Sequence, residues 1–283
     1  MDEALIGVTH DVMTMGRPVA PRGMRTRELL NYSFRLADPR MRMIKLPERA
    51  WSQALAVGEL CWHLSASDDV AFISYYAREW ASFSDDQHSI AESCYGKKIF
   101  GGEVRRSQWQ NVRDLLERDP ASRRAVLVVG EPIRESLEFR DVACITTIQF
   151  LIRDNQLHCS TSMRSNDVMW GLGYDVFFAT MLQERMALEL SVPMGSYHHF
   201  SASTHIYERH FAKAEVIMAA ESADKFRMPM MERLDALPDF LRSEWALRNN
   251  QPNAETLVNE LPRYWKELAT PLQRFRTEHR RNS

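Results

Sequence analysis

Two neighbouring strand patterns and the apolar segment after them constrain the fold of this chain most strongly. Residues 142–152 are rich in β-branched side chains, and residues 156–163 form a second strand pattern. Asp154-Asn155 lies between them and is a turn signal, so the two segments predict a β-hairpin. Residues 176–190 are strongly apolar and predict a central helix.

The rest of the chain intermixes helix and strand patterns. Apolar residues at helical spacing predict helices, and short apolar runs predict strands. In chain order we predict a helix at 48–64, an amphipathic helix at 107–118, a strand at 125–129, a strand-to-helix segment at 203–220 and polar helices from residue 228. Residues 1–25 are rich in Gly, Pro and Arg and are expected to form loops. Because strands and helices do not alternate regularly, the patterns favour an α+β fold.

Length and charge limit the classes of function. The chain has 283 residues, enough for one large domain or two small ones. Its 36 basic and 38 acidic side chains nearly balance, so no global field favours polymeric nucleic acid or an anionic membrane. No apolar stretch reaches the roughly 20 residues of a membrane span, and no secretion signal is present. We therefore expect a cytoplasmic protein that acts on small molecules.

The four cysteines show no CxxC spacing. In a chain without a secretion signal they are expected to be free thiols. No Cys/His pairs stand at the spacing of zinc ligands, so no metal site is expected.

Residues 163–175 carry most of the candidate chemistry. Arg164 and Ser165 place a guanidinium beside a hydroxyl, and the carboxylates of Asp167 and Asp175 follow. Cys144 lies about twenty residues upstream, inside the first strand pattern. A thiolate near a cation is a nucleophile, although packing in a core is the commoner role of a free cysteine. Together these groups suggest covalent chemistry on a nucleotide.

Three other places in the sequence have both a functional and a structural interpretation. Arg123 and Arg124 suit a phosphate, or form a solvated surface pair. Glu59 lies in an apolar helical pattern, where it needs a raised pKa or an ion-pair partner. His205 and Tyr207 share one side of an extended segment, where they could bind sugar hydroxyls or pack in the core.

Several short segments of the chain, in the order in which they occur in that family, resemble the thymidylate synthase family, and most closely its deoxycytidylate hydroxymethylase branch. Those segments are ELCW at 59–62, CYGK at 94–97, DPASRR at 119–124, residues 143–150, MRSNDV at 163–168 with Gly171, and THIY at 204–207 with His210. The resemblance covers roughly residues 50–212. It implies one thymidylate-synthase-like catalytic domain over 1–283, with a mixed sheet flanked by helices and a divergent helical segment from about residue 215.

The resemblance also implies catalytic roles. Cys144 would attack C6 of the pyrimidine, and Glu59 would act as the general acid and base. Tyr95 matches a residue of the proton-transfer network. Asp167 matches the aspartate near the pterin of the folate, and Trp80 aligns loosely with a residue that lines the folate site.

Substrate binding and assembly follow from the same resemblance. The implied phosphate ligands are Arg22, Arg123, Arg124, Arg164 and Ser165. In the family, the arginine pair at 123 and 124 is donated across a two-fold interface, so a homodimer packed sheet to sheet is expected. His205 and Tyr207 match the pair that binds the sugar.

The implied cofactor is 5,10-methylenetetrahydrofolate. Thiolate addition at C6 makes C5 of the pyrimidine nucleophilic enough to attack the one-carbon unit. Loss of the folate then leaves an exocyclic methylene at C5. Hydride from the folate would convert this methylene to a methyl group, whereas water would give a hydroxymethyl group.

Asp175 indicates the base. Synthases that act on uracil carry asparagine eight residues after the position of Asp167, but this chain carries aspartate. A carboxyl group can accept from the cytosine amino group and, when protonated, donate to N3. Asp175 therefore predicts a cytidine nucleotide. The structural alternative is that Asp175 is a helix N-cap without contact to the base.

The product and the sugar are less constrained. Ile145 stands where synthases usually carry histidine, and the last residues, 277–283, lack the apolar tail that excludes water. Both departures favour water as the final reactant. Together with Asp175 they predict a cytidylate 5-hydroxymethylase acting on dCMP or CMP. The alternatives are a methyltransferase acting on (d)CMP or dUMP and a non-catalytic paralogue that only binds nucleotides.

Overall fold

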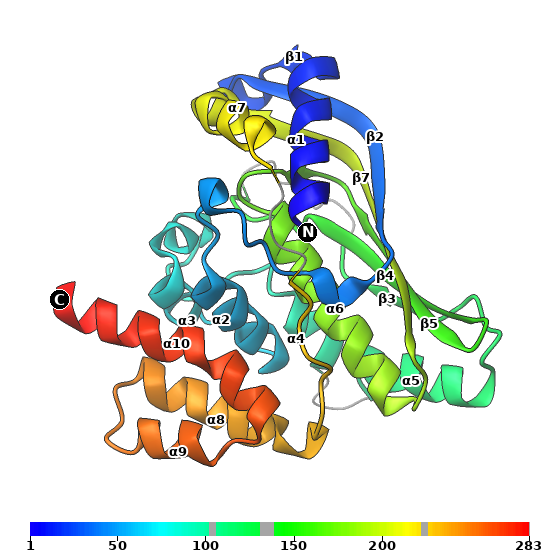
Figure 1. Cartoon of the computed structure of the whole chain (residues 1–283), viewed down its shortest axis with the longest axis vertical. Helices are drawn as coiled ribbons and strands as arrows, with labels where there is room; N and C mark the ends of the chain where they lie inside the picture. The colour runs from blue at the N-terminus through cyan, green and yellow to red at the C-terminus, as the bar shows by residue number, and fades with distance from the viewer. Residues whose placement is uncertain (102–105, 131–138, 222–225, 283) are drawn as a thin grey trace. The chain divides into compact units, whose positions relative to one another are not determined.

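The computed structural model describes residues 1–101, 106–130, 139–221 and 226–282 (Figure 1). The chain divides into two compact units. The sheet unit consists of Met1–Trp51, Trp109–Glu131 and Cys144–Met228. The helical unit consists of Ser52–Gln108, Pro132–Ala143 and Pro229–Ser283.

The sheet unit is built on a mixed seven-stranded sheet. The strands are β1 (Arg17–Val19), β2 (Thr26–Leu36), β3 (Val126–Val128), β4 (Ile145–Arg153), β5 (Gln156–Met163), β6 (Asn166–Asp167) and β7 (Met194–Tyr207). Their spatial order is β1-β2-β7-β5-β4-β3, and β6 pairs with β7 off this path. β7 runs parallel to β5 and β6, whereas the other neighbours are antiparallel. The mixed α+β architecture agrees with the sequence prediction.

The predicted hairpin is confirmed as β4 and β5. Asp154 and Asn155 join the strands with φ angles of 50° and 56°. Asn and Asp tolerate this left-handed region better than most residues, which is why this pair can form the tight turn. The strand begins one residue later than Cys144, at Ile145. Cys144 therefore lies at the open end of the hairpin, opposite the turn.

Helices cover one face of this sheet. They are α1 (Asp2–Met15), α5 (Gln108–Arg118), α6 (Leu172–Glu189) and α7 (Phe211–Ala219). α6 packs against β5 and β7, and α1 packs against β2 and β7 (Figure 1). Gln183 on α6 donates from Nε2 to the carbonyl oxygens of Leu157 and Gly195, at 2.9 and 3.1 Å. These bonds satisfy buried polar groups between helix and sheet.

The expectation of loops over residues 1–25 is wrong for the first part of that segment. α1 occupies residues 2–15, and its Leu5, Val8 and Val12 are buried. These apolar residues recur on one side of a helix. The glycine, proline and arginine content that suggested loops begins only at Gly16.

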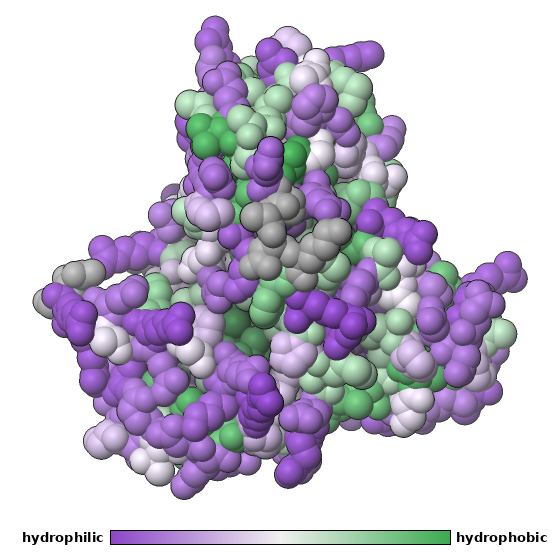
Figure 2. Space-filling view, in the orientation of Figure 1, coloured by the Kyte–Doolittle hydropathy of each residue, from purple (hydrophilic) through white to green (hydrophobic). Residues whose placement is uncertain are grey.

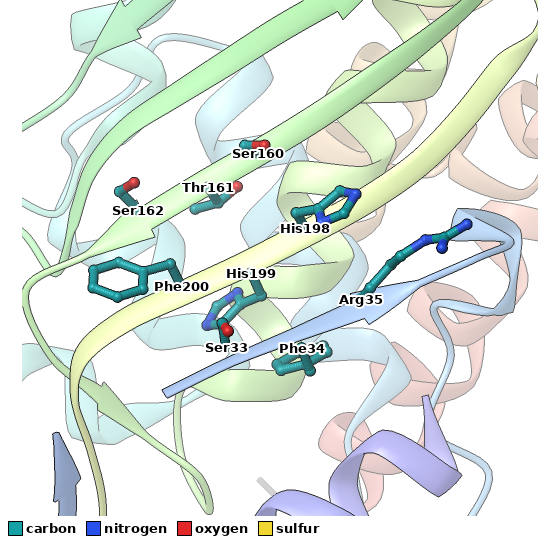
Figure 3. A pocket seen from close by; sticks show the side chains of 9 residues that line it. All are labelled: Ser33, Phe34, Arg35, Ser160, Thr161, Ser162, His198, His199 and Phe200. Atoms are coloured by element: carbon teal, nitrogen blue, oxygen red, sulfur yellow. The ribbon is translucent and has the colours of Figure 1, made fainter. Parts of the chain in front are cut away.

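None of the described helices of the sheet unit covers the opposite face of the sheet (Figure 1). Side chains alternate along β7: Tyr197 and His199 are buried, whereas His198 and Phe200 are exposed. Figure 3 shows a hollow on this part of the sheet. Its lining residues come from β2, β5 and β7: Ser33, Phe34, Arg35, Ser160, Thr161, Ser162, His198, His199 and Phe200.

The helical unit confirms the helices predicted after residue 228. It contains α2 (Gln53–Leu64), α3 (Val70–Tyr76), α4 (Tyr95–Phe100), α8 (Leu237–Arg248), α9 (Ala254–Glu260) and α10 (Arg263–Asn282). α10 packs on α2 and α8, and Trp265 is fully buried. In the view of Figure 2 the surface over α8, α9 and α10 is mostly hydrophilic. No helix in the described part of the chain is long and apolar enough to span a membrane.

The helix predicted at 48–64 begins later, at Gln53. Pro47–Arg49 form a 3₁₀ turn, and Ser52 then caps α2 by accepting a hydrogen bond from the Leu55 N–H at 3.1 Å. Four residues of the expected helix therefore belong to the connection before the cap.

Candidate functional site

The open end of the β4–β5 hairpin brings a thiol and a guanidinium together. The backbone N–H of Arg164 donates to the carbonyl oxygen of Cys144 at 2.9 Å. The Nη2 atom of Arg164 lies 3.7 Å from the Cys144 sulfur. Cys144 is partly exposed, unlike the fully buried Cys159 on β5. A cation beside a partly exposed thiol stabilises the thiolate, the form that acts as a nucleophile.

A buried amide–carboxylate pair lies a few residues further along. Asn166 on β6 donates from Nδ2 to Oδ2 of Asp175 at 2.8 Å, and both side chains are less than a tenth exposed. α6 begins at Leu172, so Asp175 lies inside its first turn and is not its N-cap. The N-cap interpretation of Asp175 is therefore wrong, and its contact with a base stays a prediction.

Gly171 leaves the space that this pair occupies. A Cβ atom at position 171 would lie 2.9 Å from Oδ2 of Asp175 and 3.2 Å from Nδ2 of Asn166. Side-chain contacts this short force a shift of the neighbours, so a larger residue would displace the pair. The sequence analysis did not identify Asn166 as a site residue. The sequence feature that could have identified Asn166 is its place between Ser165 and Asp167, in a segment already rich in functional side chains.

Asp167 organises the connection between β6 and α6. Its Oδ1 accepts the backbone N–H groups of Met169 and Trp170 at 2.8 and 3.2 Å. β6 pairs with β7 so that Asp167 stands opposite His205. Burial lowers the pKa of His205, and the charge of Asp167 opposes this effect. The ring of His205 lies edge-on to Tyr207, with centroids 5.1 Å apart.

An exposed tryptophan adjoins this group. Trp170 is 43% exposed, and its indole N–H donates to Nε2 of His210 at 2.9 Å. The guanidinium of Arg209 lies over the ring of Tyr207, 4.5 Å from its centroid. A large aromatic face open to solvent is suited to stacking on a flat ligand. The sequence analysis missed Trp170, because an isolated tryptophan gives no pattern that separates a binding surface from a core.

The other predicted arginines lie in different parts of the sheet unit. Arg123 and Arg124 are exposed, and Ala125 separates them from the edge strand β3. Arg22 is exposed in a turn, where its φ angle is 52°. Ser165 is partly buried and follows Arg164 directly. Of the predicted arginines, the structure places Arg164 against Cys144.

The helical unit holds Glu59, Tyr95 and Trp80. Glu59 on α2 is buried, and burial raises its pKa to about 8. The folded chain therefore binds a proton that the unfolded chain has released, so this group lowers stability as the pH rises from about 4.5 to 8. Tyr95 begins α4, and Trp80 packs against Trp62 with ring centroids 5.6 Å apart. From the sequence, Glu59 was predicted to have either a raised pKa or an ion-pair partner.

Comparison with known proteins gives two findings. The model of the thymidylate synthase family matches residues 6–259, beyond the last motif recognised in the sequence. The chain is also 29% identical over 212 residues to the deoxyuridylate hydroxymethyltransferase of Bacillus phage SP01. That match covers 71% of this chain and 55% of the phage protein, so the chain spans about half the length of this curated relative.

Proposed function

The chain belongs to the thymidylate synthase family, and on that premise we propose that it is a cytidylate 5-hydroxymethylase. The reaction would join a one-carbon unit from 5,10-methylenetetrahydrofolate to C5 of dCMP or CMP and then add water. Members of this family are folate-dependent one-carbon transferases. The observation that carries the choice of base is the buried pair of Asn166 and Asp175.

This pair favours cytosine because Asn166 fixes the direction of the Asp175 carboxyl group. The hydrogen bond from the Asn166 amide holds the Asp175 carboxyl group in one orientation, in which it would accept from the cytosine amino group. Protonated Asp175 could also donate to N3 of cytosine. Uracil would instead present the O4 acceptor to a carboxylate, and two acceptors facing each other without a proton are disfavoured in a buried site.

The chemistry would begin at Cys144. Its thiolate, stabilised by Arg164, would add to C6 of the pyrimidine, and the electron pair of the C5–C6 bond would then be available at C5. Glu59 would move protons as the general acid and base, with Tyr95 in the proton-transfer network. His205 and Tyr207 would hold the sugar. The proposed phosphate ligands are Arg22, Arg123, Arg124, Arg164 and Ser165.

The residues around Asp167 fit a folate. Because Oδ1 of Asp167 accepts two backbone N–H groups, its side chain is held in one orientation, and Oδ2 makes neither of these bonds. Trp170 offers an exposed aromatic face three residues after the end of β6, the strand that carries Asn166 and Asp167. Trp80 is a second candidate, in the helical unit. Methylenetetrahydrofolate would supply the one-carbon unit, and Asp167 would orient the pterin by accepting a hydrogen bond from it.

Hydroxymethyl transfer is favoured over methyl transfer by two features. The phage relative is named a hydroxymethyltransferase, although its named substrate is deoxyuridylate. Ile145 also stands directly after Cys144, at the position where synthases usually carry histidine. The choice of cytosine does not come from the relative. It comes from Asp175.

A panel of CMP, dCMP, UMP and dUMP tests this proposal, with methylenetetrahydrofolate and detection by mass spectrometry. We expect a cytidylate product heavier by one CH₂O unit, with no dihydrofolate formed. A product heavier by CH₂, together with dihydrofolate, would establish a methyltransferase. Turnover of dUMP with none of dCMP or CMP would refute the assignment of the base.

We also propose that the helix-free face of the sheet packs against a second copy of the chain. This face contains the hollow of Figure 3, and exposed Phe200 lies among its lining residues. An apolar side chain on an uncovered sheet face favours burial against a partner. A homodimer would let Arg123 and Arg124 of one chain contact the phosphate bound by the other.

Mixing two inactive variants tests the shared site. Cys144→Ser removes the proposed nucleophile, and Arg124→Ala removes a guanidinium proposed to act in the partner's site. When equal amounts of the two variants are unfolded and refolded together, about half of the dimers should be mixed. Each mixed dimer would contain one of its two sites with both residues intact, so the mixture should regain up to about a quarter of wild-type activity. Cys144→Ser mixed with itself is the control. No recovery from refolded, dimeric protein would contradict donation across the interface.

A further inference from the structure

A histidine of the helical unit contacts the proposed general acid and base. His63 lies one turn after Glu59 on α2, and its Nε2 is 3.8 Å from Oε1 of Glu59. The ring is fully buried. We propose that His63 is a positioning residue, which orients the Glu59 carboxyl group by donating to it from Nε2. This inference rests on the proposed role of Glu59.

The backbone of α4 determines which nitrogen of His63 carries the proton. The N–H of Gly96 donates to Nδ1 of His63 at 3.3 Å. A backbone N–H can only donate, so Nδ1 is the acceptor, and the proton of the neutral ring lies on Nε2. The Nε2–H group is therefore on the side of Glu59. A separation of 3.8 Å is long for a hydrogen bond, but such contacts commonly tighten when substrate binds.

Glycine at position 96 makes this arrangement possible. A Cβ atom there would lie 1.8 Å from the carbonyl oxygen of His63, in a direct clash with the backbone of α2. Any other residue would force α4 away from α2 and break the bond to Nδ1. The close approach of the two helices thus fixes the tautomer of the histidine.

Ring packing holds the orientation of His63. The ring stacks on Tyr95 with centroids 5.1 Å apart and planes 17° apart, and it also contacts Trp62 at 4.8 Å. His63 therefore touches both residues proposed to move protons, Glu59 and Tyr95. Two of its neighbours are large aromatic rings, so rotation of the imidazole away from Glu59 would require them to move.

The charge states of the pair agree with this geometry. Burial lowers the pKa of His63 to about 3 and raises the pKa of Glu59 to about 8. At neutral pH the ring is therefore neutral and Glu59 is mostly protonated. The Nε2–H group opposes the effect of burial on Glu59, because a donor favours the ionised form of the carboxyl group. On the helices packed against α2, the charged groups Glu244 and Arg248 of α8 act on Cys61. The titratable Tyr95 of α4 stacks on His63.

Two substitutions separate hydrogen bonding from packing. His63→Phe keeps an aromatic ring against Tyr95 but removes the Nε2–H donor. His63→Gln loses the ring but can place an amide N–H near the position of Nε2. Thermal unfolding and circular dichroism check that both variants fold. The carboxylic-acid band of Glu59 in infrared spectra, identified by its loss in Glu59→Gln, reports the titration of this group in the absence of substrate.

We expect His63→Phe to raise the pKa of Glu59 by about one unit, because a donor to the ionised form is lost. It should also lower kcat for the cytidylate roughly 10- to 100-fold, as loss of an orienting neighbour does at other sites, with the KM for nucleotide unchanged. His63→Gln should retain the wild-type titration and most of kcat. The opposite order, with His63→Phe like the wild type and His63→Gln impaired, would overturn the proposal in favour of a packing role.

The two readouts distinguish this inference from the proposed function. The infrared titration needs no turnover, so a shift in His63→Phe supports the contact even if none of the four nucleotides is a substrate. Turnover of a cytidylate with an unshifted titration and unchanged kcat in His63→Phe would leave the proposed function standing and refute the role of His63.

Discussion

Cys144→Ser should lower turnover of the cytidylate by at least about 10⁴-fold, because loss of a covalent nucleophile costs up to roughly 10⁶-fold in other enzymes. A serine hydroxyl is hardly ionised at neutral pH, so the neighbouring Arg164 cannot make it an equivalent nucleophile. Nucleotide affinity should change little, because the thiol is not among the proposed phosphate or base ligands. Turnover measures the first expectation, and titration calorimetry with the cytidylate measures the second.

Cys159→Ala is the matched control. Cys159 lies on β5, is fully buried, and its pKa is raised by burial, so its thiol is unsuited to act as a nucleophile. This variant should keep turnover within a few-fold of the wild type. Intact-mass spectrometry should detect a nucleotide adduct with wild-type protein and none with Cys144→Ser. Full activity of Cys144→Ser would exclude the covalent mechanism, and a biological role that persists without turnover would favour a nucleotide-binding paralogue.

Asp175→Asn should change the preferred base. Asn166 would then donate to the carbonyl oxygen of the new amide and turn its NH₂ group toward the base. This NH₂ group complements O4 of uracil and opposes the amino group of cytosine. Sites that leave a buried polar group unpaired discriminate by about 10⁴-fold. We therefore expect the ratio of kcat/KM for cytidylate to that for uridylate to fall by about this factor.

Two further variants control this experiment. Asp154→Asn makes the same chemical change at an exposed turn and should leave the ratio unchanged. Asn166→Ala removes the hydrogen bond to Asp175 and should lower kcat/KM for the cytidylate by about 10- to 100-fold, without a gain on uridylate. An unchanged base preference in Asp175→Asn would show that another residue recognises the base.

Local patterns predicted the elements whose conformation depends on near neighbours in the chain. The β4–β5 hairpin was predicted because Asp154 and Asn155 favour its turn, and α6 because its apolar residues continue over several helical turns. The start of α2 was placed too early, because apolar spacing does not register the Ser52 cap. α1 was missed because composition over 25 residues concealed a short amphipathic pattern.

The sequence by itself determined the family, the candidate nucleophile and the acidic residue at 175, because motifs in order carry that information without coordinates. Only the tertiary structure placed Arg164 against Cys144, Asn166 against Asp175, and the Gly96 backbone against His63. Each of these contacts depends on strand register or on how closely two helices approach. Register and helix spacing are set by the packing of the whole unit, so no local pattern records them.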